Sequence, residues 1–249
     1  MTIITRRGSG SHGVVVTGAG RGIGHAVATH LLDRGDNVVL GVRRPESPSV
    51  RSLAERYGSR AIPVRLDLDE PDSITAAGDE IARSLDSVAA LVHCAGINIS
   101  PSHERSASKG PLPLLVPDAV ERMFRINVTG TLRVVQAILP LFDGAGSPTI
   151  MNLGTSRGSL ALVDDEKSIG YAVTKAALTM LTRKMSFAFA GRAGCVVTVD
   201  PGWVRTDMGG EDAPVGADEA GRDLIALLDS LDVRHNGRFL SRTGEEVPW

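Results

Sequence analysis

The chain contains 249 residues, and its 42% hydrophobic content suffices to bury one sizeable core. With 27 basic and 29 acidic side chains the formal net charge is -2, which gives no positive field to gather nucleic acid or an anionic membrane. No apolar run approaches the roughly 20 residues that cross a bilayer, and the opening stretch MTIITRRGSGSHG lacks the apolar segment of a secretory signal. We therefore expect a cytoplasmic protein with neither nucleic acid nor a membrane as its partner.

Short β-branched runs alternate along the chain with longer segments of helical periodicity. The runs predict strands at residues 13–18, 37–42, 61–66, 89–96, 147–154 and 194–200, and two long helices are expected at 117–140 and 169–190. Continuous apolar strands separated by helices indicate a parallel sheet covered on both faces. With right-handed crossovers this is an α/β fold with a single doubly wound Rossmann sheet, spanning residues 13–249 after a flexible tail at 1–12.

Three long connections interrupt this alternation, at residues 97–117, 159–168 and 201–216. Each follows the carboxyl end of a predicted strand, which is the edge where open α/β sheets bind ligands. We therefore expect them to surround a binding site, although ordinary surface loops are the alternative.

The first predicted strand runs into TGAGRGIG, which places Gly18, Gly22, Ile23 and Gly24 in the turn from strand to helix. Glycines let the backbone approach a pyrophosphate, and the N-terminus of the next helix offers N–H groups and a partial positive charge. Because the pattern lies between the first strand and the first helix, it predicts a dinucleotide-binding turn.

The end of the second strand predicts which nicotinamide cofactor binds. It reads NVVLGVRRPES, with Arg43 and Arg44 where a protein that binds NAD has a carboxylate for the ribose 2′-hydroxyl. Two guanidinium groups can instead receive a 2′-phosphate, and Arg21 in the glycine turn can reach the same group. NADP(H) is therefore favoured over NAD, the alternative being a solvated strand end. Asp67 and Leu68, after the third strand, are expected to frame the adenine.

Tyr171 and Lys175 are four residues apart in YAVTK, so on a helix they share one face. A phenol with a pKa near ~10 is a poor acid–base group at neutral pH until a nearby cation favours its phenolate. Lys175 and an oxidised nicotinamide can supply that field, and the lysine can also hold the nicotinamide ribose. Two adjacent hydroxyls ahead of this pair, Thr155 and Ser156, are candidates to hold a carbonyl group.

Taken together, six motifs resemble the short-chain dehydrogenase/reductase family in their order and spacing from about residue 13 to the C-terminus. They are TGAGRGIG, HCAG at 93–96, Asn127 in FRINVTG, the hydroxyl pair, YAVTK and PGWVRTDMGG. The stretches PGWVRTDMGGEDAP and NGRFLSRTGEEVPW are similar to one branch, the C-factor and sniffer-like carbonyl reductases.

The resemblance implies roles for the candidate catalytic residues. Tyr171 would donate or accept the proton, Lys175 would support it and bind ribose, and Asn127 would hold a proton-relay water. The family has a serine that polarises the carbonyl and is followed three residues later by glycine. Gly158 aligns Thr155 with that serine, while Ser156 remains the alternative.

The resemblance also adds cofactor-binding positions on the nicotinamide side. Val204 would offer backbone groups to the carboxamide, and Thr206 would bond it or a phosphate. The others are Ala95 and Gly96 in HCAG and the turn residues Pro201 and Gly202. Asp200 departs from the family, which usually has a neutral or imidazole side chain there.

Other reactive side chains are expected to be structural. His93 is interpreted as a hydrogen-bonding residue rather than an acid or base, and Cys94 and Cys195 lie in apolar runs that favour packing over a disulfide. The histidines show no metal-ligand spacing, so we expect no metal.

The leading hypothesis is an NADPH-dependent oxidoreductase that reduces a ketone or aldehyde to an alcohol, or catalyses the reverse, with Tyr171 as acid or base. One alternative is a non-catalytic NADP(H)-binding signalling or regulatory protein, and another is a dehydratase or epimerase on the same fold. The long helices predicted at 117–140 and 169–190 have apolar faces that could pair in a homodimer or homotetramer.

Overall fold

A parallel sheet of seven strands organises the part of the chain that the computed structural model describes, residues 12–99, 112, 115–191 and 193–249. Its order is β3-β2-β1-β4-β5-β6-β9, and each neighbouring pair is parallel. The strands are β1 (His12–Thr17), β2 (Asn37–Val42), β3 (Ala61–Arg65), β4 (Ser87–His93), β5 (Thr149–Leu153), β6 (Cys195–Asp200) and β9 (Phe239–Ser241). Two short strands, β7 (Val204–Arg205) and β8 (Val215–Gly216), form a separate small parallel sheet.

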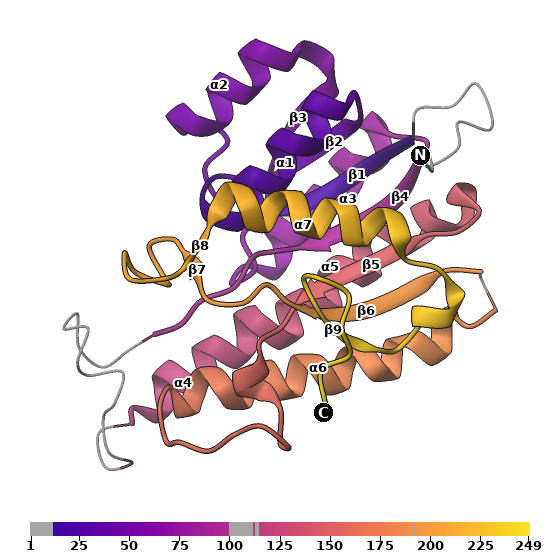
Figure 1. The fold of residues 1–249 in the computed structure, drawn as a ribbon. Coiled ribbons are helices and arrows are strands. Elements are labelled where there is room, and N and C mark those ends of the chain that lie inside the picture. The colour runs from indigo at the N-terminus through magenta and orange to yellow at the C-terminus, as the bar shows by residue number, and fades with distance from the viewer. Residues whose placement is uncertain (1–11, 100–111, 113–114, 192) are drawn as a thin grey trace.

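Helices cover both faces of the central sheet, as Figure 1 shows. One face carries α1 (Gly22–Arg34), α2 (Pro48–Tyr57) and α7 (Ala217–Ser230). The other carries α3 (Pro71–Ser84), α5 (Thr131–Ile138) and α6 (Ile169–Phe189), with α4 (Pro117–Phe124) packed beside α6. Shorter helical segments are η1 (Gly58–Arg60), the π-helix η4 (Arg125–Gly130), η5 (Leu139–Ala145), η6 (Ser156–Gly158) and η7 (Val233–His235).

The apolar strands explain why helices lie on both faces. In β1, Val14 and Val16 face the core shared with α1 and α7, and Val15 faces the core shared with α3 and α5. All three side chains are almost completely buried. A strand buried on both faces reads as a continuous apolar run because no side has to face water. The predicted α/β fold with a doubly wound Rossmann sheet is therefore confirmed.

Several predicted boundaries and elements differ from the observed ones. β1 begins at His12, inside the predicted tail, and β4 ends at His93, so that Cys94, Ala95 and Gly96 lie beyond the sheet. The seventh strand, β9, was not predicted because only three residues pair at the sheet edge. The predicted helix at 117–140 is a continuous run of α4, η4, α5 and η5. The remainder of the predicted tail and most of the connection 97–117 lie outside the described residues.

The strand order locates the crevice in which such sheets bind ligands. β1 lies between β2 and β4, so the chain reverses its direction across the sheet at this point. Ligands bind at such a switch point, beyond the carboxyl ends of the strands. The glycine turn after β1 and the Ala95–Gly96 segment after β4 meet there, because a Cβ on Gly18 would lie 3.0 Å from the backbone nitrogen of Ala95.

Candidate active site

The glycine turn after β1 has a backbone that requires glycine at two positions and tolerates no side chain at a third. Gly18 and Gly22 have φ values of +70° and +55°, in the left-handed region that side chains disfavour. A Cβ on Gly24 would lie 2.4 Å from the carbonyl oxygen of Gly18. α1 begins at Gly22, so the N–H groups of its first turn, including that of Ile23, border the crevice. This arrangement fits a pyrophosphate.

Arg21 bridges the glycine turn to the segment after β6. Its Nη1 atom lies 2.6 Å from Oδ2 of Asp207, and both side chains are exposed. Beside this ion pair, a Cβ on Gly22 would lie 3.1 Å from Cγ2 of Thr206. The structure therefore brings the predicted cofactor residues Gly22 and Thr206 together, while Arg21 is engaged with Asp207 rather than with the end of β2.

Two arginines form the exposed end of β2. Arg43 and Arg44 directly follow Val42, and both are exposed to solvent. Within the described residues no ion pair engages either guanidinium group. Their charge therefore remains available to an anionic group of a ligand in the crevice.

Asp67 and Leu68, which follow β3 and are predicted to contact adenine, have side chains that are engaged within the protein. Asp67 accepts a hydrogen bond from the backbone N–H of Asp69 at 3.0 Å, and its own N–H donates to Oγ of Ser73. The side chain of Leu68 is buried, and its Cβ would lie 3.0 Å from a Cβ on Gly130. Contact of Leu68 with a ligand would therefore use its backbone.

His93 lies in a buried hydrogen-bonded chain that fixes its protonation state. Thr131 Oγ1 donates to the carbonyl oxygen of Asn127 at 2.9 Å, so it accepts from Nε2 of His93 at 2.9 Å. Nδ1, 3.0 Å from Thr17 Oγ1, is then the acceptor, and Thr17 Oγ1 in turn accepts from the N–H of Ala95. Burial, with a smaller contribution from the charge of Lys175, lowers the pKa of His93 to about 3. The imidazole is neutral and structural, as its sequence context predicts.

Asn127 forms a clamp that joins three segments around the site. Its Oδ1 accepts from the N–H of Ile97 at 2.8 Å, and its Nδ2 donates to the carbonyl oxygen of Ile97 at 2.9 Å. Nδ2 also donates to Oγ1 of Thr174, which donates to the carbonyl oxygen of Tyr171. Both N–H bonds of this side chain are used, so it has no donor left for a proton-relay water. The π-helix η4 that presents Asn127 was not predicted, and such turns are frequent at functional sites.

Tyr171 and Lys175 lie one turn apart on α6, as predicted, and Lys175 reaches the carboxyl end of β5. Nζ of Lys175 donates to the carbonyl oxygen of Leu153, at the end of β5, at 2.7 Å. The same atom is 5.6 Å from the centre of the Tyr171 ring. Gly96 leaves room beside them, since a Cβ there would lie 3.3 Å from Oδ1 of Asn127 and 3.5 Å from Nζ of Lys175. The structure thus brings together Tyr171, Lys175, Asn127 and Gly96.

Burial dominates the acid–base properties of this pair. It lowers the pKa of Lys175 to about 8, against a smaller opposite effect of Cys94. It also raises the pKa of Tyr171 to about 12, together with the negative charge of Asp200 and against the positive charge of Arg157. Desolvation of the phenol is the largest of these effects on its pKa, and the field that Lys175 is expected to supply for the phenolate stays a prediction.

The hydroxyl pair lies at the start of η6. Thr155 has an extended backbone, and its Oγ1 accepts from the N–H of Arg157 at 3.3 Å. A Cβ on Gly158 would lie 2.8 Å from the backbone nitrogen of Ala176, so this glycine lets η6 contact α6. A third hydroxyl in this region, that of Ser159, is buried and donates to the carbonyl oxygen of Pro248 at 2.7 Å. Ser159 is thereby committed to a structural bond.

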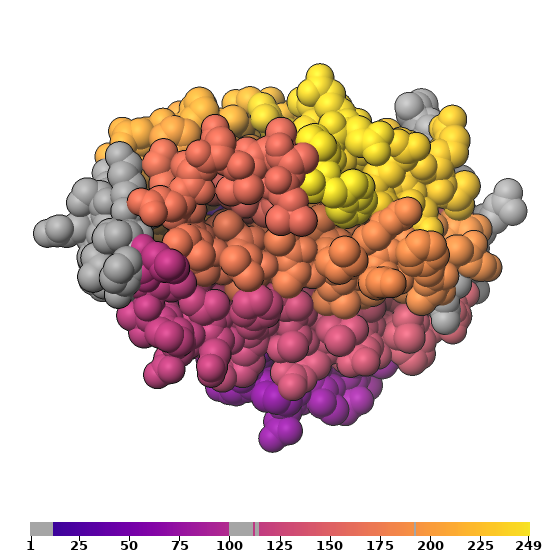
Figure 2. Space-filling view, turned by 90° about the horizontal axis from the view of Figure 1, so that it is seen from below, coloured from indigo at the N-terminus to yellow at the C-terminus, as the bar shows by residue number. Residues whose placement is uncertain are grey.

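The segment 159–168 lies against the C-terminal residues. Besides the bond of Ser159, the N–H of Ala161 donates to the carbonyl oxygen of Trp249 at 2.9 Å. Figure 2 shows this segment, in salmon, beside the yellow C-terminal residues. The C-terminal residues therefore support the connection that leads from the hydroxyl pair to Tyr171.

Asp200, at the end of β6, links two loops of the site. Its Oδ2 accepts from the N–H of Ser156 at 2.8 Å, and its Oδ1 accepts from the N–H of Gly202 at 2.9 Å. Beyond it, Gly202 has a φ of +78°, and β7 begins at Val204. The predicted nicotinamide-side residues Pro201, Gly202 and Val204 thus follow directly from the aspartate, whose role sequence reasoning did not explain.

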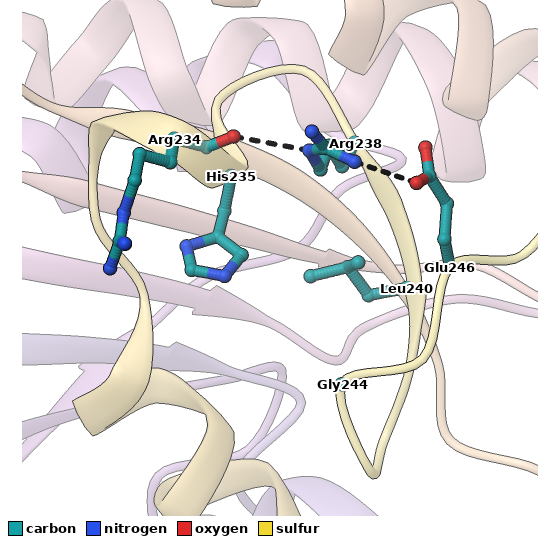
Figure 3. A pocket seen from close by; sticks show the side chains of 6 residues that line it. All are labelled: Arg234, His235, Arg238, Leu240, Gly244 and Glu246. Carbon is teal, nitrogen blue, oxygen red and sulfur yellow. Dashed lines mark hydrogen bonds and ion pairs between the residues drawn. The ribbon is translucent and has the colours of Figure 1, made fainter.

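Other reactive groups in the described residues form no second candidate site. Cys94 and Cys195 are free thiols, and no group of three or more His, Cys, Asp or Glu side chains is placed to hold a metal ion. None of the described helices is long and apolar enough to cross a membrane. A pocket beside β9 is lined by Arg234, His235, Arg238, Leu240, Gly244 and Glu246 (Figure 3). Its cationic groups are paired with carboxylates, and none of the predicted site residues lines it.

Fold and site together define the class. This is a Rossmann-type α/β protein with a glycine turn at the carboxyl end of β1 and with a tyrosine and a lysine one helical turn apart on α6. The chain belongs to the short-chain dehydrogenase family, since the family profile described as short chain dehydrogenase matches residues 12–214. Its members are oxidoreductases.

Individual relatives agree with the branch indicated by the motifs. The protein named C-signal of Myxococcus xanthus is 39% identical over 128 residues, covering 51% of this chain and 77% of that protein. NADPH-bound carbonyl reductase from chicken fatty liver has a TM-score of 0.85 at 27% identity, covering 95% of this chain and 98% of that one. Carbonyl reductase Sniffer of D. melanogaster shares the fold, with a TM-score of 0.87 at 22% identity over 95% and 99% of the chains. The predicted family and branch are confirmed.

Proposed function

We propose that this protein is an NADP(H)-dependent oxidoreductase that interconverts a ketone or aldehyde and the corresponding alcohol. The observation that carries the proposal is the convergence of Tyr171, Lys175 and Asn127 beside the space left by Gly96, at the edge of the sheet that also holds the glycine turn. A similar protein, the chicken carbonyl reductase, has NADPH bound. When bound, the cofactor supplies or accepts the hydride.

The preference for NADP(H) rests on the end of β2. Arg43 and Arg44 are exposed and free of ion pairs within the described residues, so a 2′-phosphate would displace no carboxylate. Gly18, Gly22, Ile23 and Gly24 would hold the pyrophosphate, and Lys175 would bind the ribose with the ammonium hydrogens that Leu153 does not use. The segment from Pro201 to Thr206 would hold the carboxamide, and the backbone after β3 would border the adenine.

Tyr171 is proposed to act as the proton donor in reduction. The phenol, whose pKa burial raises further above its ordinary value near ~10, is protonated at neutral pH, and an alkoxide formed from a carbonyl is a stronger base than a phenolate. Thr155 is proposed to hold the carbonyl oxygen. Its Oγ1 accepts from the N–H of Arg157, which leaves the hydroxyl hydrogen for an external acceptor. A substrate oxygen between these hydroxyls would be polarised and then protonated.

The test is turnover of a panel of ketones and aldehydes, followed by loss of NADPH absorbance, with the wild type and Tyr171→Phe. We expect the wild type to reduce at least one class of carbonyl compound, and the variant to lose at least about a hundredfold in kcat while its Kd for NADPH changes little, because the phenol acts in the transition state. Full activity of Tyr171→Phe would contradict the assignment, as would product formed by the wild type without consumption of NADPH. A homodimer or homotetramer stays a prediction.

A further inference from the structure

Arg21 lies in the glycine turn between two other parts of the sheet edge. The strand order β2-β1-β4-β5-β6 places the end of β2 on one side of this turn and the end of β6 on the other. On the β2 side, a Cβ on Gly20 would lie 3.5 Å from Cγ1 of Val42, the residue before Arg43. Arg21 directly follows Gly20, so its backbone lies near the strand end at which the 2′-phosphate is proposed to bind.

The side chain of Arg21 pairs instead with Asp207, in the segment that follows β6. Its Nη1 atom donates to Oδ2 of Asp207 at 2.6 Å. The two side chains are 72% and 75% exposed. An ion pair with this exposure is weak, because water and salt screen it, so another anion can take the place of the carboxylate.

This ion pair distinguishes Arg21 from the other two arginines that are predicted to bind the 2′-phosphate. Within the described residues, Arg43 and Arg44 form no ion pair, whereas Arg21 is held by a carboxylate that has no second cationic partner. Two anions that share one exposed guanidinium group repel each other. A phosphate that binds Arg21 would therefore displace Asp207 rather than join it.

The segment that carries Asp207 is held together by contacts other than this ion pair. Oγ1 of Thr206 accepts from the N–H of Gly209 at 3.1 Å, and Nε1 of Trp203 donates to the carbonyl oxygen of Gly209 at 2.7 Å. β7 and β8 pair within the same segment. Loss of the carboxylate charge should therefore release Arg21 without unfolding the segment.

We propose that Asp207 competes with the 2′-phosphate of the cofactor for Arg21, and that it thereby lowers the preference of the protein for NADPH over NADH. Binding of NADPH would exchange the carboxylate for the phosphate as the partner of Arg21. NADH has a hydroxyl at this position and would leave the ion pair intact. Asp207 is then a residue that determines specificity by acting through Arg21, without contact with the cofactor. This inference rests on the cofactor of the proposed function.

The test compares the Kd values for NADPH and NADH of the wild type and Asp207→Asn in fluorescence titrations, without a carbonyl substrate. Asparagine keeps the size of the side chain and removes its charge. We expect the variant to bind NADPH about threefold more tightly, as the release of one exposed ion pair allows, and to bind NADH as the wild type does. This gain is diagnostic, because damage to the segment would weaken the binding of both cofactors.

Three further variants separate the ion pair from a general effect of charge. Asp212→Asn removes an exposed carboxylate from the same segment and should leave both Kd values unchanged. Asp207→Glu keeps the carboxylate and should keep the wild-type preference between the cofactors. In an Arg21→Gln background, Asp207→Asn should no longer affect NADPH binding, because no guanidinium group remains to be released.

The outcomes distinguish this inference from the proposed function. An unchanged or weaker affinity of Asp207→Asn for NADPH, an equal gain for NADPH and NADH, or the same gain in the Arg21→Gln background would overturn the competition. The proposed function would still stand if the wild type reduced a carbonyl compound with NADPH. Tighter NADPH binding by Asp207→Asn in a protein that reduces no carbonyl compound would support the competition and contradict the proposed function. A wild type that binds neither cofactor would overturn both.

Discussion

Acid should destabilise this protein through His93, and replacing that residue with asparagine should remove this contribution. The native pKa of His93 is about 3, against 6.5 for an exposed histidine, because the ring is buried and near Lys175. Between these values the unfolded chain binds a proton that the native state does not. The contribution is therefore complete above pH 6.5 and falls by about 1.4 kcal/mol per pH unit below it. From pH 6.5 to about pH 4.5 the loss is about 2 kcal/mol, because the unfolded chain is already half protonated at pH 6.5.

The measurement is urea unfolding, followed by circular dichroism, of the wild type and His93→Asn at both pH values. Since other titrating groups are shared, the difference in unfolding free energy between the two proteins isolates His93, provided that both unfold in two states. The variant should be less stable at pH 6.5, because asparagine is too short to bridge Thr17 and Thr131. The difference in unfolding free energy between wild type and variant should shrink by about 2 kcal/mol at the lower pH. Parallel pH dependences would refute the neutral, bridging imidazole.

Two further predictions concern the cofactor. Combined replacement of Arg43 and Arg44 by alanine should weaken NADPH binding by about 30-fold and leave the Kd for NADH unchanged. The factor corresponds to about 2 kcal/mol for two charge-assisted bonds at an exposed position. Equal losses of affinity for both cofactors in fluorescence titrations would argue against a 2′-phosphate site. Gly24→Ala places a Cβ 2.4 Å from the carbonyl oxygen of Gly18 and should lower NADPH affinity at least about tenfold. The control is Gly216→Ala, where a Cβ would meet nothing within 4 Å, and this variant should bind NADPH as the wild type does.

Much of the fold follows from local patterns in the sequence. Val14, Val15 and Val16 read as a strand because all three are buried, and the same holds for the other central strands. β9 was not predicted, because an edge strand of three residues is too short to show a periodicity. The π-helix at Asn127 was not predicted, because one wide turn changes the helical spacing of apolar residues very little. Its signal is chemical, since Asn127, Thr129, Gly130 and Thr131 are polar or small residues within a predicted helix.

The candidate site is partly readable in the same way. Tyr171 and Lys175 are recognisable because their spacing of four is a local property of a helix. The contacts of Asn127 with Ile97 and of Asp200 with Ser156 join residues 30 and 44 positions apart, so they depend on how the loops pack. The phenol pKa is also a tertiary property, since burial, with a smaller effect of the negative charge of Asp200, raises it.

The most direct test of the account is a crystal structure of the protein with NADPH bound. We expect the nicotinamide to lie beside Gly96, with the hydroxyls of Tyr171 and Thr155 both within hydrogen-bond reach of one position next to the reactive ring carbon, about 3 Å from each oxygen. Ser156 in the place of Thr155 would correct the identity of the polarising group. A nicotinamide bound elsewhere, or a Tyr171 hydroxyl turned away from it, would contradict the central claim that this tyrosine transfers the proton.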